Sequence, residues 1–417
     1  MKVHLKGRWL LLVFPLVAMC VFSQQGAAFT YFSYPYGERI GALDARSLGM
    51  GGTDVAFQDN AFALNTNPAC LSLVRNFGAI SSIQVVKVDE DRAFPYHDAF
   101  DGFVGYNTYA MNSNLYGGYA FGVVKAFHRG HLPTVGVAGY PLYDWKYDYL
   151  EEVRDESDLV IGKNIMEHGG SVYAVSIGLA EEATSWLNFG AALNFLNGDG
   201  EFERRAFGDT LIVLDRQELD CDGMNFHLGA MAQVSPRIRL GLMYRSEAKL
   251  EGTAKFLGKD IAIADSSRAL QLTYPYSIAL GFEYRPRNDL TTRLNFDVEF
   301  TQWSQFEDSA NEGLNFDDIW QFAGGVEHKF LMGAPFRLGF RYQPSYQDKR
   351  VTTTAVTFGT GFAFEKFQID FGGEVATRTW RQRDLFPESY HGGVERTGED
   401  KVKESLLHAM VTIDYKF

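Results

Sequence analysis

The 417-residue sequence predicts an all-β protein, a transmembrane antiparallel β-barrel, on three observations. Aromatic residues (15%) and glycine (42 residues) are abundant and proline (12 residues) is scarce, which is typical of exported β proteins. Long segments alternate between apolar and polar residues, as the two faces of a strand require. After the first 28 residues, no run of about 18 apolar residues is present that could cross a membrane as a helix.

The N-terminus is typical of a secretory signal peptide. An apolar run over residues 9–21 follows a short basic region and is too short for a stable transmembrane helix. We therefore expect residues 1–28 to direct export by the Sec route, with cleavage between positions 23 and 28. The basic region consists of Lys2, Lys6 and Arg8.

Charge and residue types exclude several functions. The formal net charge of −13 becomes −16 once the three basic residues leave with the signal peptide, which argues against nucleic acid as a partner. Cys70 and Cys221 then remain, which is no disulfide framework, and the sequence leaves open whether they pair. The histidines form no HExxH motif and no serine lies in a GxSxG motif, so we expect no metal, no cofactor and no enzyme activity.

The segment 290–301 shows the alternation most clearly. Its apolar residues share one parity and its polar residues the other, over more positions than the usual five or six of a soluble strand. The segment 366–375 repeats the pattern. We expect the apolar faces to contact lipid and the polar faces to line the lumen. The charged residues on these polar faces include Arg293, Asp297, Glu299, Asp370 and Glu374.

The strands number about 15, and a single-chain bacterial barrel needs an even number, so 14 or 16 are admissible. This count treats 101–110 and 117–126 as separate strands. Connections alternate between short turns and long polar loops, as in outer-membrane barrels. The short turns lie at 181–184, 235–236 and 286–289, and the long loops at 150–169, 199–222, 255–273, 304–318 and 381–405.

The chain ends at Phe417, on the apolar parity of its last alternating segment. A terminal Phe that closes such a strand resembles the C-terminal signal of outer-membrane barrels. The barrel-assembly machinery is therefore an expected partner.

The segment 47–71, SLGMGGTDVAFQDNAFALNTNPACL, fits neither strand nor helix. Its glycines allow tight bends and close backbone approach, and Pro68 biases Asn67 away from helix. A wide barrel must be filled with water or plugged, and polar lumen side chains can pair with the backbone of a plug. We expect this segment to be such a plug.

Several segments together resemble the FadL-type outer-membrane transporters of long-chain fatty acids and other hydrophobic compounds. Residues 45–52, continued to Asn67-Pro68-Ala69, resemble the N-terminal hatch of that family. Further strands resemble the family in the same order along the chain. These are 240–252 with its Tyr-Arg-Ser sequence, 280–286, 301–306 with Trp-Ser-Gln-Phe, and 336–342.

The resemblance implies a 14-stranded barrel over residues 77–417, plugged by a hatch over 29–76. It implies that hydrophobic ligands, fatty acids or aromatic hydrocarbons, bind at extracellular loops, occupy an internal apolar pocket and leave by hatch-gated passive diffusion. We expect a monomer surrounded by outer-membrane lipid. The residues that the resemblance assigns to the hatch and its gating are Arg46, Gly49, Gly51, Gly52, Asn67, Pro68 and Ala69.

An alternative remains open. A barrel with a similar hatch occurs in PorV-like shuttle proteins of a secretion system, which carry a protein instead of a lipid. The Tyr-Arg-Ser and Trp-Ser-Gln-Phe segments favour the transporter. A hydrophilic porin is disfavoured because a plug would block free diffusion.

Overall fold

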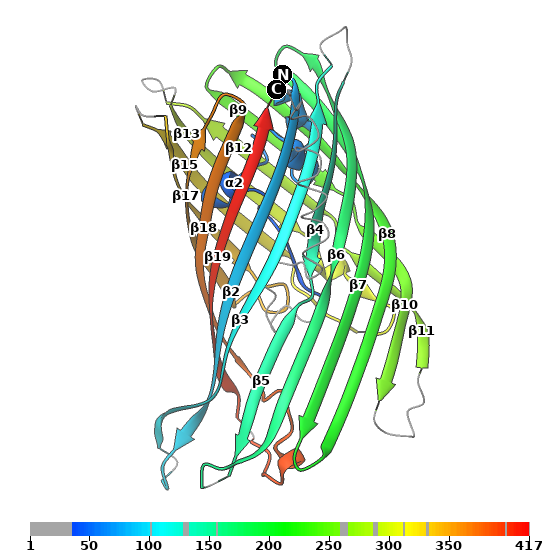
Figure 1. The fold of residues 1–417 in the computed structure, drawn as a ribbon, viewed down its shortest axis with the longest axis vertical. Coiled ribbons are helices and arrows are strands. Elements are labelled where there is room, and N and C mark those ends of the chain that lie inside the picture. Colours follow the sequence, from blue (N-terminus) through cyan, green and yellow to red (C-terminus); the bar gives the residue numbers. More distant parts are fainter. Residues whose placement is uncertain are drawn as a thin grey trace, which may run out of the picture.

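The computed structural model shows a closed antiparallel barrel of 14 wall strands in the described part of the chain (Figure 1), which confirms the predicted fold class. Eleven strands are single segments and three consist of two segments each. The barrel closes where the last strand pairs with the first along its length. The described residues are 36–100, 102–127, 133–155, 157–258, 266–286, 291–311, 313–330, 333–396 and 398–416.

The single-segment wall strands are β2 (Phe77–His97), β3 (Phe103–Lys125), β6 (Val160–Thr184), β7 (Leu187–Phe207), β8 (Leu211–Ser235), β13 (Thr292–Thr301), β15 (Ile319–Lys329), β16 (Pro335–Pro344), β17 (Thr352–Ala363), β18 (Phe367–Gln382) and β19 (Asp400–Lys416). The split wall strands are β4 (Thr134–Asp144) with β5 (Tyr147–Arg154), β9 (Ile238–Arg245) with β10 (Ala248–Gly258), and β12 (Ser277–Tyr284) with β11 (Ser266–Tyr274). The short strand β14 (Glu307–Asp308) pairs with β11.

Two expectations about strands were wrong. The predicted strands 101–110 and 117–126 are one strand, β3, because its polar centre stays paired with β2; this reduces the count from 15 to 14. The predicted loops 150–169 and 199–222, and the described part of 255–273, are mostly strand. The longest strands there, β6, β7 and β8, run for 25, 21 and 25 residues. Their residues looked like loops because the polar side chains there lie on the outer face.

The two ends of the barrel differ. At one end, here called the turn end, the chain reverses through short turns such as those after Thr184 and Ser235. At the opposite end, the loop end, longer connections follow, including residues 302–318 and 383–399 with the 3₁₀ turns η4 (Trp303–Gln305) and η5 (Glu388–His391). Among the described residues, no helix is long and apolar enough to cross a membrane.

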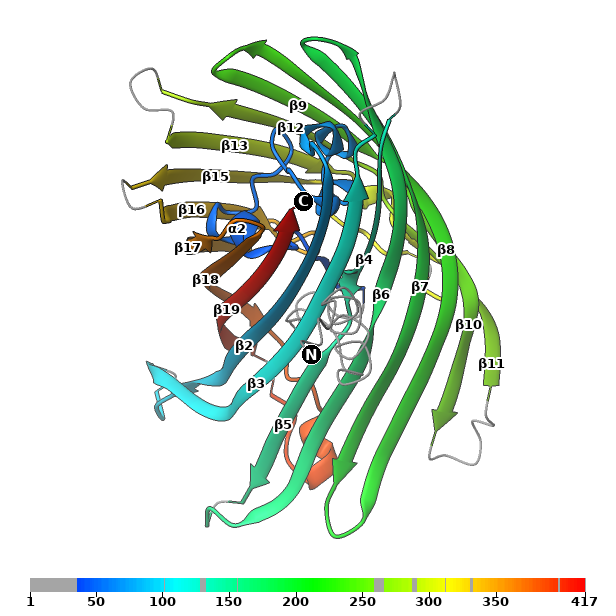
Figure 2. The same cartoon turned by 45° about the horizontal axis from the view of Figure 1, so that its top comes forward.

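Residues 36–76, here called the N-terminal segment, lie inside the barrel (Figure 2). They form β1 (Glu38–Arg39), the five-residue helix α2 (Ala45–Gly49) and the 3₁₀ turns η2 (Ala61–Leu64) and η3 (Pro68–Leu73). Each short helix begins at a side-chain cap, from Asp44, Asn60 and Asn67 respectively. The predicted signal peptide, residues 29–35 and Phe417 lie outside the described residues.

Candidate functional site: a filled lumen below an apolar cup

A ring of wall glycines holds the N-terminal segment. A Cβ atom at Gly241 would lie 2.0 Å from the carbonyl oxygen of Val55, and one at Gly325 would lie 2.4 Å from that of Met50. The backbone of the segment therefore touches the backbone of the wall, which only glycine permits. Eleven wall strands each contribute one glycine that faces the segment; eight of these glycines meet its backbone, and Gly122, Gly136 and Gly178 meet side chains of Ala61, Leu64 or Leu71. The eight are Gly190, Gly229, Gly241, Gly281, Gly325, Gly339, Gly359 and Gly372.

Sequence reasoning missed this ring, although a signal for it existed. Sequence reasoning assigned the close backbone approach to the glycines of the segment itself, and these glycines do contribute to it. Gly51 and Gly52 have φ angles of +75° and +83°, and Gly49 packs against Gly359. The wall glycines all fall on the inward parity of their strands. A glycine recurring on the inward face of successive strands indicates a packed lumen.

Asn67 ties the segment to the wall. Its Nδ2 donates to the carbonyl oxygens of Val55 at 2.7 Å and of Ala230, on β8, at 3.1 Å. Its Oδ1 caps η3 by accepting from the backbone N–H of Ala69 at 3.1 Å. Pro68 occupies the first turn of η3, where a missing N–H costs nothing. The Asn-Pro-Ala sequence is thus a fixed corner.

Arg46 joins the segment to a charged network near the turn end. Its guanidinium lies 2.6 Å from Asp59 and 3.5 Å from Glu327, which also pairs with Arg337 at 2.7 Å. Arg337 in turn pairs with Asp370 at 2.7 Å. Burial opposes the charge of Arg46, but the neighbouring carboxylates outweigh it and raise its pKa. The arginine therefore stays charged inside the lumen.

The other lumen residues expected from the sequence point inward as well. Asp297 is 6% exposed and accepts a 2.9 Å hydrogen bond from the backbone N–H of Val55. Glu299 pairs with Arg39 at 2.7 Å and Arg245 at 3.0 Å, and Glu374 pairs with Arg341 at 2.5 Å. Arg293 pairs with Glu327 at 3.1 Å. Its guanidinium lies 4.2 Å from the ring centroid of Phe57, and the guanidinium of Arg46 lies 4.4 Å from the same centroid.

A small cavity of about 160 Å³ remains in the lumen beside the segment. Charged side chains from both the segment and the wall line it, among them Arg39, Asp144, Arg245 and Glu299. Sequence reasoning did not place Arg39 or Arg245 in the lumen, although Arg245 is the arginine of the Tyr-Arg-Ser sequence. The inward parity of Arg245 on β9 was the available signal.

Toward the loop end the wall reverses its polarity. Along β7 the outer face changes from Phe189, Leu193 and Phe195 to charged residues, whereas the inner face becomes apolar. The outer charged residues are Asp199, Glu201, Glu203 and Arg205, and the inner apolar residues are Leu196, Phe202 and Ala206. A strand with this pattern leaves the lipid at the change of face. Beyond that point β7, β8 and β10 carry polar residues on their outer faces and line an apolar part of the interior, which includes Leu219 and Leu250 and is here called the cup.

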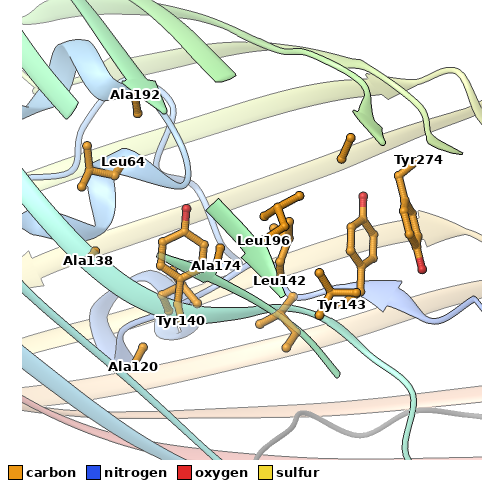
Figure 3. Close-up of a cluster of buried hydrophobic side chains, with 14 of the residues drawn as sticks. Leu64, Ala120, Ala138, Tyr140, Leu142, Tyr143, Ala174, Ala192, Leu196 and Tyr274 are labelled. Carbon is orange, nitrogen blue, oxygen red and sulfur yellow. The ribbon is translucent and has the colours of Figure 1, made fainter. Parts of the chain in front are cut away.

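Aromatic rings fill the cup above the N-terminal segment. Tyr143 stacks on Tyr274 with ring centroids 4.0 Å apart, and Trp303 stacks on Tyr346 at 3.8 Å. Figure 3 shows apolar side chains continuing from Leu64 of the segment past Tyr140 and Leu196 to Tyr143 and Tyr274. Phe306, Phe316 and Tyr36 complete the aromatic cluster.

The wall is interrupted between β3 and the split strand β4–β5. β3 pairs with β4 over five residues only, Phe121–Lys125, and in the described chain no backbone ladder joins it to β5. Side chains bridge the interval instead: Asn112 accepts from the Leu150 N–H at 2.8 Å and Asn114 donates to the Asp148 carbonyl at 2.5 Å. This interval is called the wall gap below.

An outer groove of about 1080 Å³ adjoins the wall gap. One part of its lining is apolar or aromatic and includes Leu115, Tyr119 and Phe195. The rest is polar and includes Lys146 and Glu201. The groove therefore runs along the boundary at which the exterior changes from apolar to polar. The sequence had shown no mark that placed such a gap.

The loop 383–399 crosses the loop end and packs on β5 to β8 (Figure 1). Phe386 stacks on Tyr149 at 6.3 Å, and His391 lies 2.9 Å from Oδ1 of Asn164. Arg396 pairs with Asp384 and Glu388 within the loop and ties the loop to the wall through Asp400, the first residue of β19, at 3.4 Å. The loop thus covers an apolar cluster on the inner face of the wall, at the mouth of the cup.

The described residues contain no group of three or more His, Cys, Asp or Glu side chains that could hold a metal ion. Cys70 and Cys221 are both free thiols and both buried, so they do not pair. Burial raises the pKa of the Cys70 thiol to about 12. Neither cysteine is a nucleophile in this fold.

Comparison with known proteins gives one family. The model of the family described as outer membrane protein transport protein (OMPP1/FadL/TodX) matches residues 175–379. No curated protein matches the sequence.

Solved structures show the same fold at low sequence identity. The toluene transporter TodX of Pseudomonas putida is 18% identical, with a TM-score of 0.63 over 90% of this chain and 99% of that chain. A Pseudomonas aeruginosa FadL homologue is 12% identical, with a TM-score of 0.66 over 91% of this chain and 100% of that chain. The Ralstonia pickettii toluene transporter TbuX is 17% identical, with a TM-score of 0.59 over 90% of this chain and 99% of that chain.

Proposed function

Because the chain belongs to the OMPP1/FadL/TodX family of outer-membrane transport proteins, we propose that it takes up hydrophobic small molecules across the bacterial outer membrane by passive diffusion. The reversal of polarity along β7 carries this proposal. A wall that is polar outside and apolar inside beyond the lipid offers a hydrophobic ligand an apolar site within the aqueous surroundings. Ligand burial there gains about 0.8 kcal/mol per CH₂ group, so hydrophobic contact alone can hold an acyl chain or an aromatic ring.

The aromatic lining favours ring compounds among the possible ligands. The paired rings of Tyr143 with Tyr274 and of Trp303 with Tyr346 offer flat faces and edges to a further ring. TodX and TbuX are named as toluene transporters, which supports the same class here. Long-chain fatty acids are the second ligand class, and the charged lumen cavity below the cup would face their carboxylate.

The ligand leaves sideways, through the wall gap into the membrane. Passage past the N-terminal segment would instead require that segment to leave its glycine contacts with eleven strands. In this proposal the segment is the hatch that keeps the turn end closed, and Arg46, Asn67 and the paired carboxylates hold it. The protein acts as a monomer in outer-membrane lipid, after insertion by the barrel-assembly machinery.

Identification of co-purified ligand tests the proposal. The full-length protein is purified in detergent, and bound small molecules are extracted and identified by mass spectrometry, with toluene and dodecanoate as competitors. We expect an apolar ligand that either competitor displaces. A protein that carries no apolar ligand, binds neither competitor and co-purifies with a stoichiometric protein partner would instead be a PorV-like shuttle.

A further inference from the structure

Trp145 stands at the boundary between the lumen and the outer groove. It lies in the break between β4 and β5, and its two neighbours in the chain line different cavities. Asp144 lines the lumen cavity, and Lys146 lines the outer groove beside the wall gap. The indole of Trp145 points into the cup, where it is 1% exposed. Trp145 thus stands between the lumen cavity and the outer groove, and a ligand released sideways must pass from the first to the second.

The indole rests on a seat of glycines. A Cβ atom at Gly200 would lie 2.8 Å from Cε3 of Trp145, and one at Gly198 would lie 3.1 Å from Cη2. At the opposite edge, a Cβ at Gly37 would lie 3.1 Å from Cδ1. A methyl group at Gly200 would force the ring to shift, and one at Gly198 or Gly37 would crowd it. The seat is therefore flat and is sized for a bicyclic aromatic ring.

Few polar contacts fix the indole on this seat. Its Nε1 donates one long hydrogen bond, of 3.3 Å, to the hydroxyl of Tyr274. The ring of Phe202 lies 6.2 Å away at a tilted angle. The backbone N–H of Trp145 donates to the carbonyl oxygen of Gly170 at 3.2 Å. The indole is therefore positioned mainly by apolar packing, whereas its backbone is tied to β6.

The wall beside Trp145 contains little else that could obstruct a ligand. Gly169 and Gly170 of β6 line the groove there, and Gly170 has a φ of +115°. A Cβ atom at Gly169 would meet no atom within 4 Å. The groove beside Trp145 is lined by this glycine backbone and by polar residues that include Lys146, Glu167 and Ser171.

We propose that Trp145 is the gate of the lateral exit: its indole swings off the seat formed by Gly198 and Gly200, and a flat ligand ring takes its place before entering the outer groove. This inference rests on the proposed function and adds to it a gating residue and a ligand class, planar aromatic compounds of one or two rings. The indole occupies the seat in the resting protein, so the gate is closed without ligand.

Size selectivity tests the gate. Cells that carry the full-length protein in their outer membrane are given labelled toluene, with one ring, or labelled phenanthrene, with three fused rings, and initial uptake rates are compared. In Trp145→Ala, the ratio of phenanthrene to toluene uptake rises by about tenfold, as expected when a pocket loses a size restriction. Gly200→Ala, which pushes the indole from its seat, raises the same ratio, and Trp145→Phe gives an intermediate ratio.

The control is Trp320→Ala, a tryptophan on the outer face that is 53% exposed and should leave the ratio unchanged. Faster migration of unboiled samples in SDS gels shows that each variant is folded. If wild-type cells take up toluene but folded Trp145→Ala has an unchanged ratio, or loses both rates in parallel, the gate is rejected and the proposed function stands. If wild-type cells take up neither compound faster than cells without the protein, the proposed function itself fails.

Discussion

Oδ2 of Asp297, on the inner face of β13, accepts a 2.9 Å hydrogen bond from the backbone N–H of Val55 in the N-terminal segment. Asp297→Ala removes this acceptor, and the buried N–H of Val55 then lacks the hydrogen bond, which destabilises the seated segment by about 1–3 kcal/mol. We expect the segment to detach more often, so single-channel recordings in planar bilayers should show more frequent ion-conducting openings. Asp220→Ala, on the outer face, is the matched control. Equal opening frequencies in the two variants would contradict the role of Asp297.

Acid should loosen the N-terminal segment through Asp59. Burial alone would raise the pKa of Asp59, but the charges of Arg46 and Lys416 outweigh it and hold that pKa well below its usual range. A depressed pKa stabilises the folded arrangement above the unfolded value of about 4, and this stabilisation is lost as the pH falls toward the folded-state pKa. Ion conductance should therefore stay constant from pH 7 to about pH 4 and increase as the pH falls further, toward about pH 2. Asp59→Asn should conduct already at pH 7 and respond less to acid; a wild-type response in that variant would exclude Asp59 as the titrating group.

A side chain in the glycine ring should destabilise the filled lumen. In Gly241→Ala the new Cβ would lie 2.0 Å from the carbonyl oxygen of Val55, so the segment must shift, at a cost of about 1–3 kcal/mol. The temperature at which the unboiled gel band converts to the slow form should fall, and conductance should rise. Gly105→Ala serves for comparison, since its Cβ would meet no atom within 4 Å. Identical behaviour of both variants would show that the segment does not depend on close wall contact.

Filling the outer groove should stop lateral release. Gly169 lines the groove and has free space beside its Cα, so Gly169→Phe adds a large side chain without a clash at the Cβ. Uptake of toluene should fall by about tenfold, which corresponds to a barrier raised by about 1.4 kcal/mol. Ligand that is already in the cup should stay bound, so equilibrium binding in detergent should not change. Unchanged uptake would mean that the ligand leaves by another route.

The sequence was sufficient to predict the barrel and the orientation of its strands. Strict alternation placed Leu294 and Phe296 on the outer face and Asp297 on the inner face, since neighbouring residues of a strand must point in opposite directions. The corner at Asn67-Pro68 could likewise be predicted, because a proline restricts the backbone of the residue before it. These features depend on a few residues that are adjacent in the chain.

The cup, the wall gap and the Trp145 seat could not be predicted in the same way. Asp199 and Glu201 looked like loop residues, because a polar outer face is indistinguishable from a solvated loop until the register of the hairpin is known. The seat joins Trp145 to Gly198 and Gly200 across an intervening strand. The wall gap exists because, among the described strands, β3 does not pair with β5. The sequence of a strand does not indicate which neighbouring strand it fails to pair with.

The length of β6 and β8 has a consequence for the permeability of the cell surface. Strands of 25 residues measure about 80 Å at roughly 3.3 Å per residue, and a tilt of about 45° still leaves a height of about 55 Å. The hydrocarbon layer accounts for only about 25–30 Å of that height. The rest projects into the hydrated headgroup and carbohydrate zone, which repels apolar solutes far more than the hydrocarbon beneath it does. Under the proposed function, the apolar lining of β7, β8 and β10 would carry a solute past this zone, and the wall gap would return the solute to lipid beneath it.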